Sequence, residues 1–323
     1  MTDIALIQSA AARLAGHARV TPLLHAPLLD ALAGRRVLVK AECLQLTGSF
    51  KFRGGWSAIS ALDPATRARG VMAYSSGNHA QGVALAAQRH GVPAVILMPS
   101  DAPQVKIANT RAYGAEVILY DRATEDRDAL GAALTAERGL TLVKPFDDAQ
   151  VIAGQGTTGL EIADQAQALG VTEATVLTCC GGGGLTAGIA LALERRAPGL
   201  TVRPVEPAGF DDTARSLASG RIERNAAATG SVCDAILTPA PGALTFPILS
   251  RLCGAGLTVT DDQALRAMAL AFAHLRIVLE PGGAVALAAA LFHDDLPDTV
   301  ICTASGGNVD PATFRMALDR YPA

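Results

Sequence analysis

The sequence predicts an α/β protein with open, twisted, mostly parallel sheets flanked by helices. Apolar runs of four to six residues alternate with helical stretches of ten or more, and no internal repeat or long linker interrupts them. Such runs are typical of parallel strands that are buried on both faces. Ligands in these folds bind beyond the carboxyl ends of the strands, so we expect function in the loops that follow the strands.

The elements alternate along the chain. Strands are expected at 36–40, 71–74, 94–98, 116–120, 140–143, 174–177, 201–205 and 300–303. Helices are expected at 51–61, 80–90, 103–113, 124–138 and 185–195. The handedness of the crossovers between parallel strands then limits the topology.

A change of pattern near residue 147 suggests two domains. Residues 71–148 hold four short units of their own, and Pro145-Phe146-Asp147-Asp148 breaks the alternation. We therefore expect a small domain at 71–148 that closes over a substrate. It is inserted into a larger domain made of 1–70 and 149–323.

Composition excludes several classes of protein. Half of the residues are hydrophobic, only 18% are charged, and the mean hydropathy is +0.29, which excludes a disordered chain. Thirty acidic residues against 27 Lys plus Arg give no basic excess for nucleic acid. The N-terminus lacks the pattern of a signal peptide, and the uncharged stretch 174–193 favours strand, loop and helix over a membrane span. We expect a cytoplasmic protein.

A run of glycines offers a site for an anion. Four glycines follow a predicted strand and precede a predicted helix: Gly181, Gly182, Gly183, Gly184 and then Leu185. Glycines allow close backbone approach, and a helix N-terminus presents free N–H groups and a positive dipole end, so the pattern indicates a phosphate cradle. A flexible turn is the simpler alternative. The spacing is not that of a dinucleotide fingerprint.

Three further loops carry reactive groups. Lys51 opens a helix in apolar surroundings, which disfavour its ammonium form as an imine-forming lysine requires; a lone lysine is otherwise usually a solvated one. Ser75-Ser76-Gly77-Asn78-His79 offers donors to a carboxylate, or simply caps a helix. Ser305 precedes Gly306-Gly307-Asn308 and could reach a ring nitrogen, or lie in an ordinary turn.

Together, S-F-K, S-S-G-N-H, G-G-G-G-L and S-G-G-N, in this order and spacing, resemble fold-type II pyridoxal-phosphate enzymes. The nearest branch is that of threonine/serine dehydratases and serine racemases. The resemblance runs from about residue 17 to 316 and includes V-I-A-G-Q-G-T at 151–157 and E-P-G-G at 280–283. It implies a fold like that of the tryptophan synthase β chain, with pyridoxal 5'-phosphate bound by the larger domain.

The resemblance also implies roles for single residues. Lys51 binds the cofactor as an imine and, once freed by substrate, moves the α-proton; Ser76 is the second acid/base, on the opposite face. Phe50 packs near the ring, Asn78 bonds the ring hydroxyl, and Ser305 is the partner of the pyridine nitrogen. The phosphate lies on Gly181–Leu185. The substrate lies on Ser75, Ser76, Gly77, Asn78 and His79.

A cation site is expected after the strand 201–205. Two carboxylates and an intervening carbonyl in E-P-A-G-F-D-D could hold a hard cation, although Asp211 or Asp212 could instead merely cap the next helix. Cation-dependent serine racemases and related dehydratases carry E-P-x-x-x-D-D here. The resemblance therefore implies Mg²⁺ or another divalent cation on Glu206, Asp212 and the Phe210 carbonyl.

Three functions remain open from the sequence. The first is an ammonia-lyase that converts L-threonine or L-serine to a 2-oxo acid. The second is a 3-hydroxyaspartate dehydratase, with Arg53, Arg127 or Lys144 holding the extra carboxylate, or a serine racemase. The third is a nicotinamide-dependent oxidoreductase or a non-catalytic nucleotide-binding protein, against which the missing fingerprint argues.

Some features depart from the resemblance. The chain ends soon after Asn308, so no C-terminal regulatory domain is expected. Phe146 falls where serine-racemase-like relatives tend to have a polar residue, and 238–245 differs from their usual serine- and glycine-rich loop. Both departures bear on which hydroxy amino acid is the substrate. By analogy with relatives, we expect a homodimer.

Overall fold

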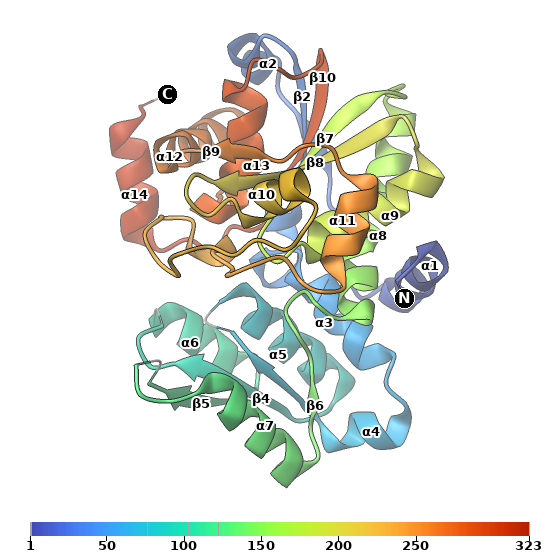
Figure 1. The fold of residues 1–323 in the computed structure, drawn as a ribbon, viewed down its shortest axis with the longest axis vertical. Coiled ribbons are helices and arrows are strands. Elements are labelled where there is room, and N and C mark those ends of the chain that lie inside the picture. Colours follow the sequence, from blue (N-terminus) through green and yellow to red (C-terminus); the bar gives the residue numbers. More distant parts are fainter. Residues whose placement is uncertain (1, 76, 103, 122, 323) are drawn as a thin grey trace.

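The computed structural model describes residues 2–75, 77–102, 104–121 and 123–322. It forms two lobes stacked along the long axis of the molecule, each built around one sheet (Figure 1). The larger sheet has six strands in the order β1-β2-β10-β7-β8-β9, and the smaller has four in the order β5-β4-β3-β6. All pairs are parallel except β1 with β2. The predicted fold class is confirmed.

The strands of the smaller sheet come from one continuous part of the chain. Its strands are β3 (Val71–Tyr74), β4 (Ala94–Pro99), β5 (Glu116–Tyr120) and β6 (Thr141–Leu142). The larger sheet contains β1 (Leu23–His25), β2 (Arg36–Lys40), β7 (Ala174–Cys179), β8 (Leu200–Pro207), β9 (Leu257–Val259) and β10 (Thr299–Thr303). The smaller sheet thus falls inside the expected 71–148 insertion, while the domain boundaries themselves stay a prediction.

Helices cover both sheets. The helices up to residue 138 are α1 (Ile4–Leu14), α2 (Pro27–Ala33), α3 (Lys51–Ser60), α4 (Pro64–Arg69), α5 (Asn78–His90), α6 (Gln104–Ala112) and α7 (Arg127–Arg138). The later ones are α8 (Ala149–Ala168), α9 (Gly184–Arg196), α10 (Asp212–Ser219), α11 (Thr245–Leu252), α12 (Asp261–Leu270), α13 (Pro281–Phe292) and α14 (Pro311–Arg320). Short 3-10 turns lie at Glu42–Leu44, Leu46–Gly48 and Asp234–Ile236, and a π-helical turn lies at Ala271–Leu275.

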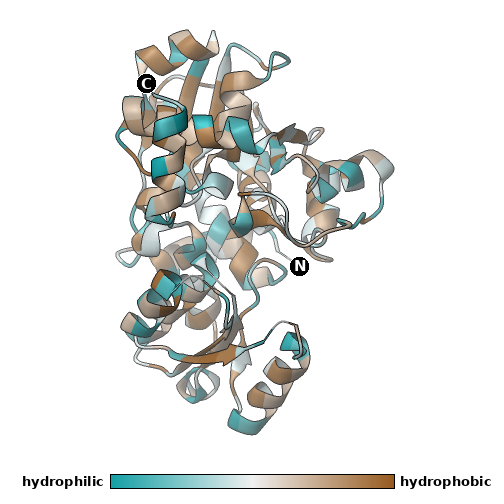
Figure 2. Ribbon diagram, turned by 90° about the vertical axis from the view of Figure 1, so that its left-hand side faces the viewer, coloured by the Kyte–Doolittle hydropathy of each residue, from teal (hydrophilic) through white to brown (hydrophobic). Residues whose placement is uncertain are grey.

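Alternation along each strand divides the core between the two faces of each sheet. In β10, Val300 and Cys302 join the cluster under α12 and α13, while Ile301 joins the cluster under α8 and α9. In β3, Val71 faces α5 and Met72 faces α7. Figure 2 shows the same division, with mostly brown strands inside and mixed teal and brown helices outside. Both faces of each sheet are covered, as the unbroken apolar runs predict.

Several boundaries differ from the prediction. Helix α5 begins at Asn78 rather than at 80, so the last two residues of the S-S-G-N-H motif belong to its first turn. Helix α7 begins at Arg127 rather than at 124, because the Asp126 carboxylate caps it by accepting from two backbone N–H groups. The elements that were not predicted are strands β1 and β9 and helices α1, α2, α4, α8, α11, α12, α13 and α14. The patterns of β1, β9 and α2 are too short to give a clear period, and α13 is buried on nearly every side.

Helix α3 lies at the junction of the two lobes and packs against both α5 and α8 (Figure 1). Two glycines make its approach to α5 possible. A Cβ on Gly82 would meet the Lys51 carbonyl carbon at 2.9 Å, and one on Gly55 would meet the Gly82 carbonyl oxygen at 3.1 Å. Lys51, the first residue of α3, is thereby held beside the beginning of α5. None of the helices in the described ranges combines the length and apolar character needed to cross a membrane.

Candidate active site

A cavity of about 800 Å³ lies where the carboxyl ends of both sheets converge. Tyr74, Pro99 and Tyr120, the last residues of three strands of the small sheet, line one side. Cys179 ends β7 on the other side, and Ser305 follows β10. The cavity therefore occupies the position expected for a ligand site in an open parallel sheet.

All four predicted loops meet at this cavity. From the predicted cofactor and substrate set, the lining residues are Phe50, Lys51, Ser75, Gly77, Asn78, His79, Gly181, Gly182, Gly183, Gly184, Leu185 and Ser305. Ser76 lies outside the described residues, so its predicted place is not tested. Motifs more than 250 positions apart in the chain thus reach one space.

The Lys51 amine faces the cavity with little compensation for its charge. Its Nζ donates a hydrogen bond to the Pro145 carbonyl at 2.8 Å and lies 5.2 Å from the centre of the Phe50 ring. Burial lowers the pKa of Lys51 to about 8, against the opposing effect of the Glu280 carboxylate. A substantial fraction of the amine is therefore neutral and nucleophilic near neutral pH.

The glycine run is built for close backbone approach. Gly183 has a φ of 88°, in the left-handed region, and a Cβ there would meet Leu249 at 2.8 Å. A Cβ on Gly182 would collide with the Phe146 ring, which packs against the loop. Among the described residues, the N–H groups of Gly181, Gly182 and Gly183 find no hydrogen-bond acceptor, and α9 begins directly after them. The loop therefore presents free donors at a helix N-terminus, as an anion requires.

The loop after β3 orders itself around a short turn. The Ser75 Oγ accepts a hydrogen bond from the Gly77 N–H at 3.1 Å. His79 is 2% exposed, and its Nε2 lies 2.8 Å from the Val143 carbonyl. Burial and then the charge of Lys51 lower the pKa of His79 to about 3. A neutral ring that donates from Nε2 leaves Nδ1 as an acceptor, and this buried atom has no partner among the described residues.

Asn78 is bonded to two side chains from distant parts of the chain. Its Nδ2 donates to Glu280 Oε1 at 2.5 Å, and its Oδ1 accepts from Asn308 Nδ2 at 2.7 Å. Glu280 is 2% exposed, and burial raises its pKa to about 7 despite the opposing effect of the nearby Lys106 ammonium. E-P-G-G and S-G-G-N were part of the resemblance, but no role was predicted for Glu280 or Asn308.

Two other lining residues were missed by the sequence reasoning. Gln155 is 1% exposed, and neither atom of its amide has a partner among the described residues. A Cβ on Gly184 would lie 2.8 Å from its Oε1, so the amide borders the glycine run. Lys106 Nζ forms an ion pair with Asp234 at 3.2 Å, joining α6 of the small lobe to a loop of the large lobe. Gln155 lies in the V-I-A-G-Q-G-T segment of the resemblance, to which no role was given, while Lys106 lies in no motif that could have indicated it.

The structure corrects one candidate for a second substrate carboxylate. Arg53 does not line the cavity; it is buried with its guanidinium bonded to Glu42 and Glu161 at 2.7–2.9 Å. Because its guanidinium already donates to these two carboxylates, Arg53 is not available to bind a substrate. Arg127 and Lys144 do line the cavity.

The predicted cation ligands lie together on the large lobe. Glu206 is fully buried, and its two oxygens accept from the N–H groups of Thr213 and Ala214 at 2.9 and 2.8 Å, so it caps α10. Neither Asp211 nor Asp212 makes that cap. Asp212 Oδ1 accepts from Asn225 Nδ2 at 2.6 Å, while its buried Oδ2 has no partner among the described residues.

The pKa values of both carboxyl groups are raised in this cluster. Burial and then the Asp212 carboxylate raise the pKa of Glu206 to about 8, and burial raises that of Asp212 to about 6. No three His, Cys, Asp or Glu side chains converge anywhere in the described ranges, so any cation here would need carbonyl or water ligands as well.

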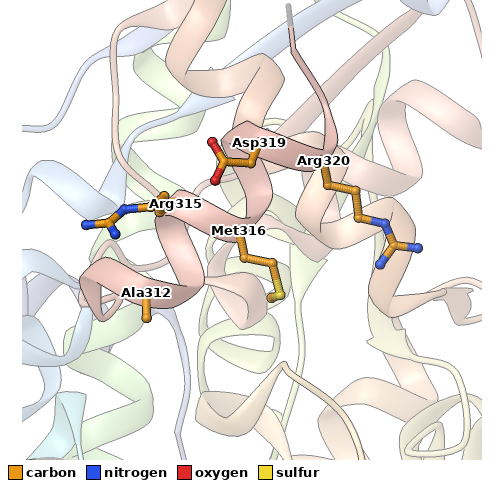
Figure 3. A pocket seen from close by; sticks show the side chains of 5 residues that line it. All are labelled: Ala312, Arg315, Met316, Asp319 and Arg320. Atoms are coloured by element: carbon orange, nitrogen blue, oxygen red, sulfur yellow. The ribbon is translucent and has the colours of Figure 1, made fainter.

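A second hollow, of about 520 Å³, lies on the outer side of α14 (Figure 3). Ala312, Arg315, Met316, Asp319 and Arg320 line it, and all belong to this one helix. It is separate from the four loops. We assign it no part in the chemistry.

Comparisons with known proteins agree with the site. The family model described as "Pyridoxal-phosphate dependent enzyme" matches residues 14–307. An L-threo-3-hydroxyaspartate ammonia-lyase from Pseudomonas sp is 41% identical over 311 residues, which cover 96% of each chain. A solved threonine deaminase from T.th. is 47% identical, with a TM-score of 0.90 over 95% of this chain and 99% of that one. Maize serine racemase is 34% identical, with a TM-score of 0.91 over 99% and 97%.

These similarities extend over nearly the whole chain and include the segments that form the cavity. They decide against the nicotinamide-dependent oxidoreductase and the nucleotide-binding protein that the glycine run had left open. The chain belongs to the family of pyridoxal-phosphate-dependent enzymes, whose cofactor is pyridoxal phosphate.

Proposed function

We propose that this enzyme is an ammonia-lyase that eliminates water from a hydroxy amino acid, foremost L-threonine or L-serine, to give an enamine, whose imine tautomer is then hydrolysed by water to a 2-oxo acid and ammonia. The observation that carries the proposal is the Lys51 amine, which borders a cavity with unpaired glycine N–H groups on its wall. The named relatives, two ammonia-lyases or deaminases and a racemase, support the reaction class.

The residues present fit pyridoxal phosphate. The free N–H groups of the glycine run and the start of α9 suit its phosphate, and the buried Lys51 amine suits its aldehyde. Phe50 would pack near the ring, Asn78 would bond the ring hydroxyl, and Ser305 would face the ring nitrogen. When bound, the cofactor supplies an electron sink for the bond that breaks at the substrate α-carbon.

The protein's own groups then divide the work. The backbone and hydroxyls of the 75–79 loop hold the substrate carboxylate, and Lys51 removes the α-proton. Ser305 offers a neutral hydroxyl, which, unlike a carboxylate, does not favour protonation of the ring nitrogen. A weaker electron sink favours loss of the β-hydroxyl over reprotonation at carbon.

The first experiment measures release of 2-oxo acid and ammonia from L-threonine, L-serine, D-serine and the 3-hydroxyaspartate isomers. Fast release from threonine or serine supports the proposal. Absence of release from every hydroxy amino acid would refute it. Ser76→Ala tests the racemase alternative, since loss of a second base should reduce racemisation far more than elimination from the L-isomer.

A hydroxyaspartate is the second candidate substrate. The side chains of Arg127 and Lys144 line the cavity and offer cations to a second carboxylate. The Pseudomonas relative, named for this substrate, supports it. A kcat/KM for L-threo-3-hydroxyaspartate above that for threonine would make it the principal substrate.

We also propose that Glu206, Asp212 and the Phe210 carbonyl bind Mg²⁺ or another divalent cation. The buried, unpartnered Asp212 Oδ2 beside a second buried carboxylate supports this, because unpaired buried charge is costly. Calorimetric titration with Mg²⁺ should show binding that Asp212→Asn abolishes. No binding, with full activity in chelator, would contradict the site.

Light scattering would test the expected homodimer.

A further inference from the structure

The side chain of Asn78 is held in one orientation by two residues to which the mechanism gives no role. Asn78 Oδ1 accepts from Asn308 at 2.7 Å, and Asn78 Nδ2 donates to Glu280 at 2.5 Å. A primary amide has one oxygen and two N–H groups. With the oxygen and one N–H engaged, the amide cannot turn over without losing both bonds, and one N–H remains free for a ligand.

Asn308 also reaches the loop that carries Lys51. Its two N–H groups are both used, one on Asn78 and the other on the Thr47 carbonyl at 2.8 Å. Thr47 has a φ of 61°, which is costly for a β-branched residue and persists only where neighbours enforce it. The Gly307 N–H donates to the Gly48 carbonyl at 2.9 Å and strengthens the same attachment.

The glycines around these residues leave room for the hydrogen bonds. A Cβ on Gly306 would collide with Glu280 Oε1 and lie 3.1 Å from Asn78 Nδ2. A Cβ on Gly48 would lie 2.6 Å from Asn308 Oδ1. The Glu280 carboxyl therefore lies between the Gly306 backbone and the Asn78 amide, in space that only a glycine at 306 leaves open.

Glu280 differs from an ordinary structural partner in one respect. Its Oε1 accepts from Asn78, while its Oε2 is buried at the cavity wall with no partner among the described residues. The bond that Asn78 Oδ1 accepts from Asn308 polarises the amide and strengthens its N–H groups as donors, while the bond to Glu280 fixes which N–H stays free. Asn308 does not line the cavity, so it acts only through Asn78 and Thr47.

We propose that Asn308 and Glu280 are positioning residues that clamp Asn78 so that its free N–H points to the ring hydroxyl of the cofactor. This inference rests on the proposed function, because that function places the ring hydroxyl at Asn78. The clamp joins three segments, at 47–51, 78 and 280–308, so it aligns the ring with the lysine that holds it.

The test compares two cofactors that differ only in the ring hydroxyl. Apoenzyme is titrated with pyridoxal phosphate and with its analogue lacking that hydroxyl. Asn308→Asp keeps the shape but removes both donors, and it should weaken pyridoxal phosphate at least tenfold while changing the affinity for the analogue less than threefold. Glu280→Gln should likewise weaken the binding of pyridoxal phosphate more than that of the analogue. Asn109→Asp, the same change at an exposed position on α6, should alter neither affinity.

A spectroscopic readout separates positioning from general damage. The pH at which the visible band of the bound cofactor titrates should shift in Asn308→Asp and Glu280→Gln, and not in Asn109→Asp. Equal losses for the two cofactors, or an unshifted titration, would overturn the clamp. If Asn308→Asp does not fold, Asn308→Ala and Glu280→Gln decide by the same criteria.

Failure of the proposed function gives a different result. If Asn78→Ala weakens the binding of both cofactors by the same factor while Lys51 is still labelled by borohydride reduction, the clamp is wrong and the lysine assignment stands. If wild-type protein neither binds pyridoxal phosphate nor is labelled at Lys51, the proposed function fails and the clamp fails with it.

Discussion

Two cations two positions apart on α3, the half-buried Lys51 and the buried Arg53, have opposite surroundings. Arg53 lies in an ion cluster, defined here as Lys40, Glu42, Arg53 and Glu161, where its guanidinium is bonded to two carboxylates. Lys51 faces the cavity, where its amine donates to the neutral carbonyl of Pro145. Residues at i and i+2 of a helix do not share a face, so the two side chains enter different environments.

The difference appears in the protonation of the two groups. Burial disfavours the charge of Arg53, but Glu42 and Glu161 outweigh burial and raise its pKa. Burial prevails at Lys51 and lowers its pKa to about 8. A buried charge that its neighbours compensate has a structural role, because removing one partner is costly, while an uncompensated one is free for chemistry. Compensation by neighbours therefore separates a structural cation from a reactive one.

The largest expected effect is loss of catalysis without loss of fold. Lys51→Ala should reduce turnover at least about a thousandfold, since it removes both the cofactor attachment and the proton carrier. Within the described residues its side chain bonds only to a backbone carbonyl, so we expect stability close to that of the wild-type apoenzyme. Steady-state kinetics and urea unfolding of the apo forms measure the two quantities. Turnover within tenfold of wild type would contradict the assignment.

Arg53→Met should have the opposite main effect, which is a loss of stability. It leaves the fully buried Glu42 without its main partner, which should cost about 3–5 kcal/mol of unfolding free energy. Arg138→Met is the matched control, because its ion pair with Glu116 is exposed and should contribute less than about 1 kcal/mol. Urea unfolding measures both. If the two losses were equal, the ion cluster would not be the structural site that we describe.

The pH dependence of cofactor attachment sharpens the comparison. An amine whose pKa is lowered to about 8 becomes neutral as the pH rises through that value, so about one amine in ten is neutral at pH 7. The rate at which apoenzyme captures pyridoxal phosphate covalently should thus rise with pH and level off above about pH 8.5. Glu280→Gln removes the charge that favours the ammonium, so the midpoint should move to lower pH. Stopped-flow absorbance measures the rate. A midpoint near 10 would show that Lys51 is not desolvated.

Much of this arrangement follows from local sequence. The sheets were predictable because buried parallel strands are continuous apolar runs. The four loops were predictable because each places glycines or a reactive side chain just after a strand or at a helix start. Lys51, the glycine run and the substrate loop from Ser75 to His79, apart from the undescribed Ser76, all reach the cavity.

What could not be predicted depends on contacts between distant segments. Asn78 meets Glu280 and Asn308 across 202 and 230 positions of sequence, and no local period encodes such a pairing. Arg53 was misjudged for the same reason, since its partner Glu161 is 108 positions away. The cap of α10 comes from Glu206, several residues before the helix, rather than from the aspartates next to its start.

Gln155 provides the smallest and most discriminating test. Its amide is as buried as Arg53, yet neither of its polar atoms has a partner in the described part of the chain, so it resembles Lys51 in lacking compensation. A buried polar group without partners costs about 1–3 kcal/mol of unfolding free energy. The Gln155 amide also borders Gly184 at the start of α9. Gln155→Leu should therefore stabilise the apoenzyme by about 1 kcal/mol and weaken the binding of pyridoxal phosphate about tenfold.

Gln81→Leu is the control, because that equally buried glutamine lies away from the cavity lining. Thermal unfolding and cofactor titration measure the two effects. If Gln155→Leu destabilised the apoenzyme and left cofactor affinity unchanged, the unpaired amide would have a structural role, and missing compensation alone would not identify functional groups here.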